Sequence, residues 1–170
     1  ASVRERSEKL LADEPDARAV AVARLATFGG FWVAAVDSFP QEAAMLHGLL
    51  SETEVMIPPE ERYRVMPTAL TLLGEGNEAV QGAMEVGVIR TSNPVDVVIR
   101  WAAAMTGVLL TSNVSDASPV PVDATVLANQ LQRDLLLGWG APLDLVDGAE
   151  AHVAALAQTG PLAPPVDDQP

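Results

Sequence analysis

Prolines and glycines divide this sequence into stretches of helical length, and within those stretches apolar residues recur at three- and four-residue spacings. The alternation of apolar and polar residues that is typical of a strand is nowhere sustained. No internal repeat is evident. We therefore predict an all-α fold, a single-domain bundle of about six to seven helices over residues 1–158, followed by a disordered proline-rich tail over residues 159–170.

Capping residues and prolines give the expected helix boundaries. Asp16 and Asp123 are the expected N-caps of two helices, and Pro94 opens another. Pro67 and the glycine-rich residues 74–76 are expected to kink or interrupt the helix that contains them. The predicted helices span about residues 3–13, 17–37, 41–53, 58–87, 94–112, 123–138 and 147–158, with a polar loop over 113–121.

The second predicted helix is the most aromatic part of the chain. Two adjacent glycines in its middle, Gly29 and Gly30, each cost roughly 1 kcal/mol relative to alanine. Either a close contact with another helix compensates for this cost, or the helix bends there. The residues that predict one apolar face on this helix are Val20, Leu25, Phe28, Phe31, Trp32 and Ala35.

The net charge of −13 argues against direct nucleic-acid binding by this chain. Lysine and arginine supply much of the affinity for phosphates, and here one lysine and nine arginines are spread thinly. There is no cysteine, which excludes disulfides and thiolate zinc sites. No uninterrupted apolar stretch reaches the roughly 20 residues of a membrane span, and the charged N-terminus is unlike a signal peptide. We expect a cytoplasmic location and no membrane contact.

Two stretches of the sequence resemble a known family. Residues 83–96 read AMEVGVIRTSNPVD, and residues 132–140 read QRDLLLGWG. They resemble the E-x-G-x-(I/L)-R phrase with its (D/N)-P loop, and the closing L-L-x-G-(L/W) phrase, of the C-terminal regulatory domain of the TetR family of bacterial transcriptional repressors. Gly107 stands where a mid-helix glycine usually follows. The resemblance covers most of residues 3–140 and implies an effector-binding and dimerisation domain that senses a small, largely apolar ligand.

Members of that family carry an N-terminal helix-turn-helix, and nothing in this sequence resembles it. The helix predicted over 3–13 would correspond to the connector that follows that module. DNA is therefore an expected partner only through an absent N-terminal part. Either that part was removed, or the protein never had one.

Aromatic and methionine side chains on several predicted helices are the candidates for a ligand pocket. Aromatic residues make up only 4% of the chain, and methionine adapts its shape to varied apolar ligands. The same side chains would equally fill an ordinary core, and His47 would be either a ligand hydrogen-bond partner or a structural histidine. The candidate ligand-binding residues are Phe28, Phe31, Trp32, Met45, His47, Leu49, Met66, Leu70, Met84, Trp101 and Met105.

The helices predicted over 94–112 and 123–138 carry broad apolar surfaces with small residues between them. Two such helices from each of two subunits would pack as a four-helix bundle across a two-fold axis, although the same faces would also bury within one subunit. A stand-alone homodimer that serves as a protein–protein interaction module, without a ligand, is the alternative function. The candidate dimer-interface residues are Val108, Leu109, Val126, Leu127, Gln130, Leu131, Asp134 and Leu135.

Catalytic and cofactor motifs are missing from the sequence. No serine stands in a nucleophile-elbow phrase, and residues 74–76 lack the lysine of a phosphate-binding loop. His47 and His152 are isolated, without a ligand cluster for a metal, and His152 is expected to be solvated. We expect no enzymatic activity, no metal and no cofactor.

Overall fold

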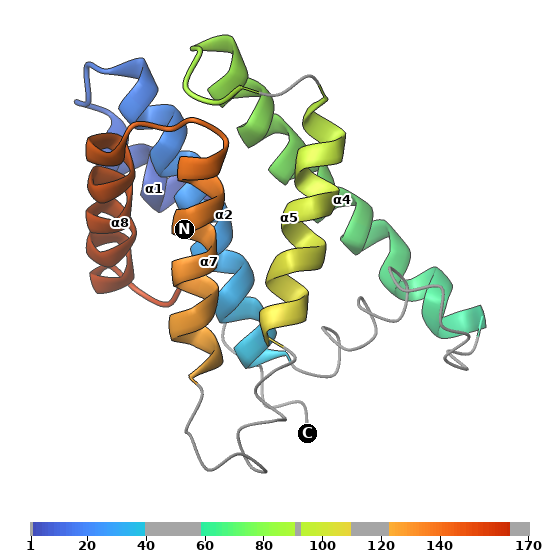
Figure 1. Cartoon of the computed structure of the whole chain (residues 1–170). Helices are drawn as coiled ribbons and strands as arrows, with labels where there is room; N and C mark the ends of the chain where they lie inside the picture. Colours follow the sequence, from blue (N-terminus) through green and yellow to red (C-terminus); the bar gives the residue numbers. More distant parts are fainter. Residues whose placement is uncertain (1, 40–58, 91–92, 110–122, 164–170) are drawn as a thin grey trace.

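The computed structural model describes residues 2–39, 59–90, 93–109 and 123–163. All regular structure within these ranges is α-helical, which confirms the predicted fold class (Figure 1). The expected helix over 41–53 and the expected loop over 113–121 lie outside the described residues. The helices are α1 (Val3–Leu11), α2 (Ala17–Ser38), α4 (Pro59–Glu85), α5 (Pro94–Leu109), α7 (Ala124–Gly138) and α8 (Leu143–Gln158).

Side-chain caps begin three of these helices where they were predicted. Asp16, Asn93 and Asp123 each accept a hydrogen bond from a backbone N–H two or three residues further on, at 2.8, 3.1 and 3.0 Å. A cap of this kind contributes about 1 kcal/mol, because it satisfies an N–H group that has no partner within the helix. The predicted starts of α2, α5 and α7 are therefore confirmed.

The expected interruption of α4 is wrong, since the helix runs unbroken from Pro59 to Glu85. Pro67 lies inside it and removes one N–H donor. The carbonyl that loses its partner is that of Tyr63, four residues earlier, and Tyr63 is 79% exposed, so water can reach this part of the helix. One turn later the Thr71 hydroxyl donates to the Pro67 carbonyl at 3.0 Å. Solvent exposure explains why this helix tolerates the proline.

The C-terminal part of the folded region is longer than predicted at both ends. α8 begins at Leu143 rather than at about residue 147, with Pro142 as its N-cap and Asp144 in its first turn. Beyond α8, Arg6 donates hydrogen bonds to the Thr159 hydroxyl and the Pro161 carbonyl. Residues 159–163 thus pack back against α1, and the folded part extends past the expected boundary at residue 158.

α2 lies at the centre of the bundle and contacts α1, α4, α5, α7 and α8. Its buried residues point in all directions, so the single apolar face predicted for it was too narrow. By length and composition α2 is also the one helix in the described part of the chain that is apolar enough to cross a membrane. In the structure 56% of that apolar stretch is buried, as expected for the core helix of a helical bundle.

A close contact between α2 and α7 accounts for one of the two central glycines. The Gln132 amide of α7 lies against Gly29, where a Cβ would overlap it. Its Nε2 donates to the carbonyls of Ala26 and Leu25, at 3.2 and 3.4 Å. Of the two explanations offered by the sequence, the compensating helix contact is the one found at Gly29.

Two glycines with positive φ end α4 and α7 in the same way. Gly87 has φ +70° and Gly140 has φ +102°, values that L-residues with a side chain rarely adopt. In each case the residue after the glycine donates back to the carbonyl five residues earlier, at 2.9 and 3.0 Å, which makes a Schellman ending. The two endings touch, because the Arg90 N–H donates to the Trp139 carbonyl at 2.8 Å.

Gly29→Ala should destabilise the fold by about 1–3 kcal/mol, because the new methyl group must displace the buried Gln132 amide. Gly74→Ala is the matched control. It lies inside α4 with nothing within 4 Å of its Cβ position, and should stabilise the protein by about 0.5–1 kcal/mol. Urea unfolding of the two variants measures both effects. Equal effects in the two variants would contradict the proposed role of the α2–α7 contact.

Candidate functional site

An open groove of about 1340 Å³ runs between α1, α2, α4 and residues 159–163. Ligand pockets for drug-sized molecules typically measure about 300–1,000 Å³, so the groove has room for such a ligand. Its lining mixes aromatic, aliphatic and charged side chains. The residues that line it are Ser2, Val3, Arg4, Arg6, Ser7, Glu8, Arg24, Thr27, Phe28, Phe31, Glu75, Glu78, Ala79, Thr159, Gly160, Pro161 and Ala163.

Three polar side chains join α1, α2 and α8 beside the groove. The Ser7 hydroxyl hydrogen-bonds the Thr27 hydroxyl at 3.1 Å and Nε2 of His152 at 2.9 Å. His152 is half-buried, so the expectation that it is solvated was wrong. Burial lowers the pKa of His152 from its ordinary value, against a smaller opposing effect of the Glu8 carboxylate. The neutral imidazole is therefore the favoured form in the folded protein.

A serine bonded to a histidine invites a catalytic interpretation, which the geometry does not favour. Ser7 is only 2% exposed, and its hydroxyl is shared with Thr27. Among the described residues no third group is bonded to the other ring nitrogen of His152, as a nucleophilic triad requires. The described part of the chain also contains no cluster of three or more potential metal ligands. The serine–histidine pair therefore serves to fix α1 against α2 and α8.

Charged side chains on the groove walls are mostly paired. Both carboxylate oxygens of Glu8 accept from Arg24, at 2.7 and 2.6 Å. This hydrogen bond to Arg24 is the main reason that the pKa of Glu8 lies below its ordinary value. Arg4 is 3.5 Å from the Glu78 carboxylate, which links α1 to α4. The ion pairs hold α1 between its two neighbours at the edge of the groove.

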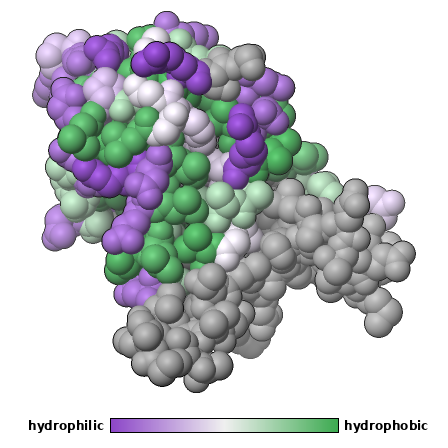
Figure 2. Space-filling model, in the orientation of Figure 1, coloured by the Kyte–Doolittle hydropathy of each residue, from purple (hydrophilic) through white to green (hydrophobic). Residues whose placement is uncertain are grey.

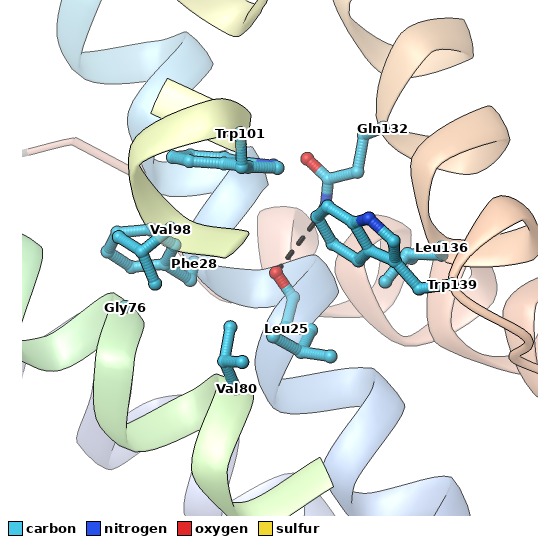
Figure 3. A pocket seen from close by; sticks show the side chains of 9 residues that line it. All are labelled: Leu25, Phe28, Gly76, Val80, Val98, Trp101, Gln132, Leu136 and Trp139. Atoms are coloured by element: carbon cyan, nitrogen blue, oxygen red, sulfur yellow. Dashed lines mark hydrogen bonds between the residues drawn. The ribbon is translucent and has the colours of Figure 1, made fainter. Parts of the chain in front are cut away.

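The bundle also has a small internal cavity of about 20 Å³, shown in Figure 3. A cavity of this size is room for about one water molecule. The Gln132 amide reaches into this region from α7 toward the Leu25 carbonyl of α2. Phe28 lines both the cavity and the groove, so its ring lies between the two. The side chains around the cavity are those of Leu25, Phe28, Val80, Val98, Trp101, Gln132, Leu136 and Trp139, with Gly76 completing the wall.

Three of the predicted ligand residues, Phe28, Trp32 and Trp101, form an aromatic cluster in the core beside the cavity. The Phe28 and Trp101 rings have centroids 4.9 Å apart, and the Trp32 and Trp101 rings 5.1 Å apart in an edge-on arrangement. Such aromatic pairs contribute about 0.5–1.5 kcal/mol beyond the burial of their area. Trp32, Trp101 and Met105 are almost completely buried. Their position agrees with the alternative that they fill the core rather than line an open ligand pocket.

The other predicted ligand residues are scattered. Phe31 lines the groove with Phe28. Met84 packs against a different part of the core, around Val22 and Val80. Met66 and Leu70 are exposed on the part of α4 that diverges from the bundle. Met45, His47 and Leu49 lie outside the described residues.

The predicted dimer-interface residues divide into two groups. Val126, Leu127, Gln130 and Asp134 are exposed on the outer face of α7. Val108, Leu131 and Leu135 instead pack against the aromatic cluster. The backbone of Leu109 belongs to α5, but its side chain is outside the described part of the structure.

The exposed face of α5 carries apolar residues that the sequence prediction missed. Val95 and Ile99 are 53% and 52% exposed, and Ala103 and Gly107 continue the same four-residue spacing. The periodicity was visible in the sequence, but the prediction followed the opposite, buried side of this helix. We call the exposed apolar residues Val95 and Ile99 of α5 and Val126 and Leu127 of α7, taken together, the α5–α7 face. The two helices run antiparallel, and each pair lies near the start of its own helix, so the pairs lie toward opposite ends (Figure 1). In Figure 2 hydrophobic residues gather down the middle of the side on which these helices lie in front.

Arg6 and the segment 159–163 also belong to the groove, although neither was predicted as a site. No pattern in the sequence marks Arg6, and residues 159–163 lie in the expected disordered tail.

Comparisons with known protein families, with characterised proteins and with solved structures give no match.

The lowered pKa of His152 predicts that acid weakens the fold. The unfolded chain takes up a proton near the ordinary pKa of 6.5, whereas the folded protein resists protonation to lower pH. This contribution is fully present above pH 6.5 and is lost as the pH falls through the folded-state value. Urea unfolding at pH 8 and pH 5 should show a larger loss of stability for the wild type than for His152→Gln. An equal loss in both proteins would contradict the assignment.

Proposed function

We propose that this chain is the effector-binding and dimerisation domain of a TetR-like transcriptional regulator, and that its ligand binds in the groove. The observation that carries the proposal is the groove itself, which is far larger than the internal cavity and is walled by three helices and the segment after α8. The two TetR-like phrases in the sequence supply the class of regulator. The proposal adds a site: the ligand contacts the groove face of α2, where Phe28 and Phe31 lie.

The groove is well placed to report ligand binding through α1. Three residues of α1 line it and bond to neighbouring helices: Ser7 bonds to α8, Glu8 to α2 and Arg4 to α4. A ligand in the groove would change these contacts and favour one position of α1 over another. Differential affinity for two conformations is sufficient for such a response and requires no bond chemistry. In the TetR-like interpretation α1 is the connector to a DNA-binding module.

The α5–α7 face supports the dimerisation half of the proposal. Valine, isoleucine and leucine side chains are exposed on α5 and α7, two helices that contact each other, and burying them in a dimer would favour association. Two helices from each subunit suffice for a four-helix bundle across a two-fold axis. The same face also fits the alternative function, a homodimeric interaction module without a ligand.

Native mass spectrometry of the purified chain tests the ligand and the assembly together. We expect a dimer that carries additional mass, and we expect this mass to be lost on denaturation. A dimer without added mass, even after incubation with small-molecule extracts, would favour the interaction module over the sensor. A monomer without added mass would contradict both functions.

Ile99→Asp and Val126→Asp should each convert the dimer to monomers, because an unpaired carboxylate would be buried in the interface. We expect dimer affinity to fall by about a hundredfold or more, as measured by sedimentation equilibrium. Leu131 is less suitable for this test, because it packs against the aromatic cluster and a charge there would disturb folding.

Leu143→Asp is the matched control for the interface test. Leu143 is 54% exposed, but it begins α8, away from the α5–α7 face, and an acid is favourable at a helix N-terminus. This variant should remain dimeric. If all three variants form dimers of equal affinity, the α5–α7 face is not the interface.

A further inference from the structure

Arg6 differs from the other arginines of the groove in its partners. Arg24 and Arg4 are each paired with a glutamate. Arg6 bonds only neutral acceptors among the described residues, the Thr159 hydroxyl at 2.9 Å and the Pro161 carbonyl. A guanidinium has five N–H donors and stays charged at physiological pH, so these two bonds leave donors and the full positive charge available.

The position of Arg6 is fixed by the turn that follows α8. Gly160 has φ +144°, and a Cβ there would lie 2.8 Å from Nη1 of Arg6. The turn can therefore approach the guanidinium closely only because this residue is glycine. Since Thr159 and Pro161 hold two of its nitrogens, the side chain gives up little further conformational entropy on binding a ligand.

The charges of the groove point to a ligand with a single negative charge. Three arginines and three glutamates line it, so its walls are neutral in sum. Glu8 and Glu78 are neutralised by their partners, while Glu75 belongs to the α4 wall and Arg6 to the wall made by α1 and residues 159–161. Among the described residues, Arg6 is the lining cation without a carboxylate partner and can pair with one anionic group, whereas the equally unpaired Glu75 would repel any second negative charge. A dianion such as a phosphate monoester would meet more repulsion from the glutamates.

The remaining lining of the groove is apolar on the α2 side and beside the turn. Phe28 and Phe31 contribute aromatic rings, and Pro161 and Ala163 continue the apolar surface next to Arg6. Because Phe28 also borders the internal cavity, an apolar group that moves its ring would gain access to further apolar wall. Beside the turn, the groove thus combines the unpaired positive charge of Arg6 with a surface for an alkyl or aryl body.

We infer that the groove binds a monoanionic amphiphile, a small organic carboxylate whose head group pairs with Arg6 and whose alkyl or aryl body lies against Phe28 and Phe31. The inference rests on the proposed ligand-binding function and names its ligand class. A charge-assisted, bidentate pair between guanidinium and carboxylate supplies the selectivity for the head group. Burial of the hydrocarbon body supplies most of the affinity.

Isothermal titration calorimetry with decanoate, decanol and decyl phosphate, each below its micelle concentration, tests the ligand class. We expect decanoate to bind the wild-type protein about tenfold or more tightly than decanol, and more tightly than decyl phosphate. Arg6→Gln should abolish the preference for decanoate over decanol, and Arg6→Lys should retain part of it. Arg18→Gln is the matched control, because it removes the same charge from an exposed position outside the groove and should leave the preference intact.

The outcomes separate this inference from the proposed function. If decanol or decyl phosphate binds the wild type as tightly as decanoate, the carboxylate assignment is wrong while the groove remains a ligand site. The carboxylate assignment is also wrong if Arg6→Gln and Arg18→Gln change the preference equally. If none of the three probes binds and the native mass spectrum shows no added mass, the ligand-binding function itself is wrong. Thermal unfolding of each variant checks that lost binding does not reflect lost folding.

Discussion

The burial of α2 is the constraint on which the rest of the structure depends. Five other described helices contact it, and its apolar side chains point toward all of them. Burying a large apolar side chain contributes about 1.5–3 kcal/mol, so a helix surrounded in this way supplies much of the free energy of folding. Each neighbour then needs only one apolar face toward α2. The outer side of α5 keeps Val95 and Ile99 exposed, and the groove lies between α1, α2, α4 and residues 159–163.

The sequence was sufficient for features that depend on local chemistry. Caps and prolines predicted the starts of α2, α5 and α7, because a side-chain acceptor or a missing N–H acts within one helical turn. Features that depend on tertiary contacts were missed. Whether Pro67 breaks a helix depends on solvent around one carbonyl. The way α8 lies against α1 decides two further features. It half-buries His152, and it brings Arg6 to residues 159–161. Trp32, Trp101 and Met105, which were predicted to line a pocket, fill the core for the same reason.

The two phrases that resemble TetR-family regulators have a definite structural meaning. Each contains the glycine of a Schellman ending, Gly87 in α4 and Gly140 in α7. Endings of this type close roughly a third to a half of helices, so either phrase alone says little about a family. The two phrases together describe a more specific arrangement, because the Arg90 N–H donates to the Trp139 carbonyl and joins the two helix endings. That bond fixes the end of α4 against the end of α7.

Phe28 gives the proposed sensor a physical route from ligand to interface. Its ring borders the groove on one side and packs on Trp101 of α5 on the other, with centroids 4.9 Å apart. Gly76 of α4 lies directly against the same ring, so α4 leaves it little free space on that side. A ligand that moves Phe28 must therefore change the packing of Trp101, and with it the position of α5. Because α5 carries half of the exposed α5–α7 face, a small shift there alters the geometry of any dimer built on that face. A tenfold difference in ligand affinity between two such arrangements corresponds to about 1.4 kcal/mol. When the two arrangements are otherwise close in free energy, this difference is enough to change which of them predominates.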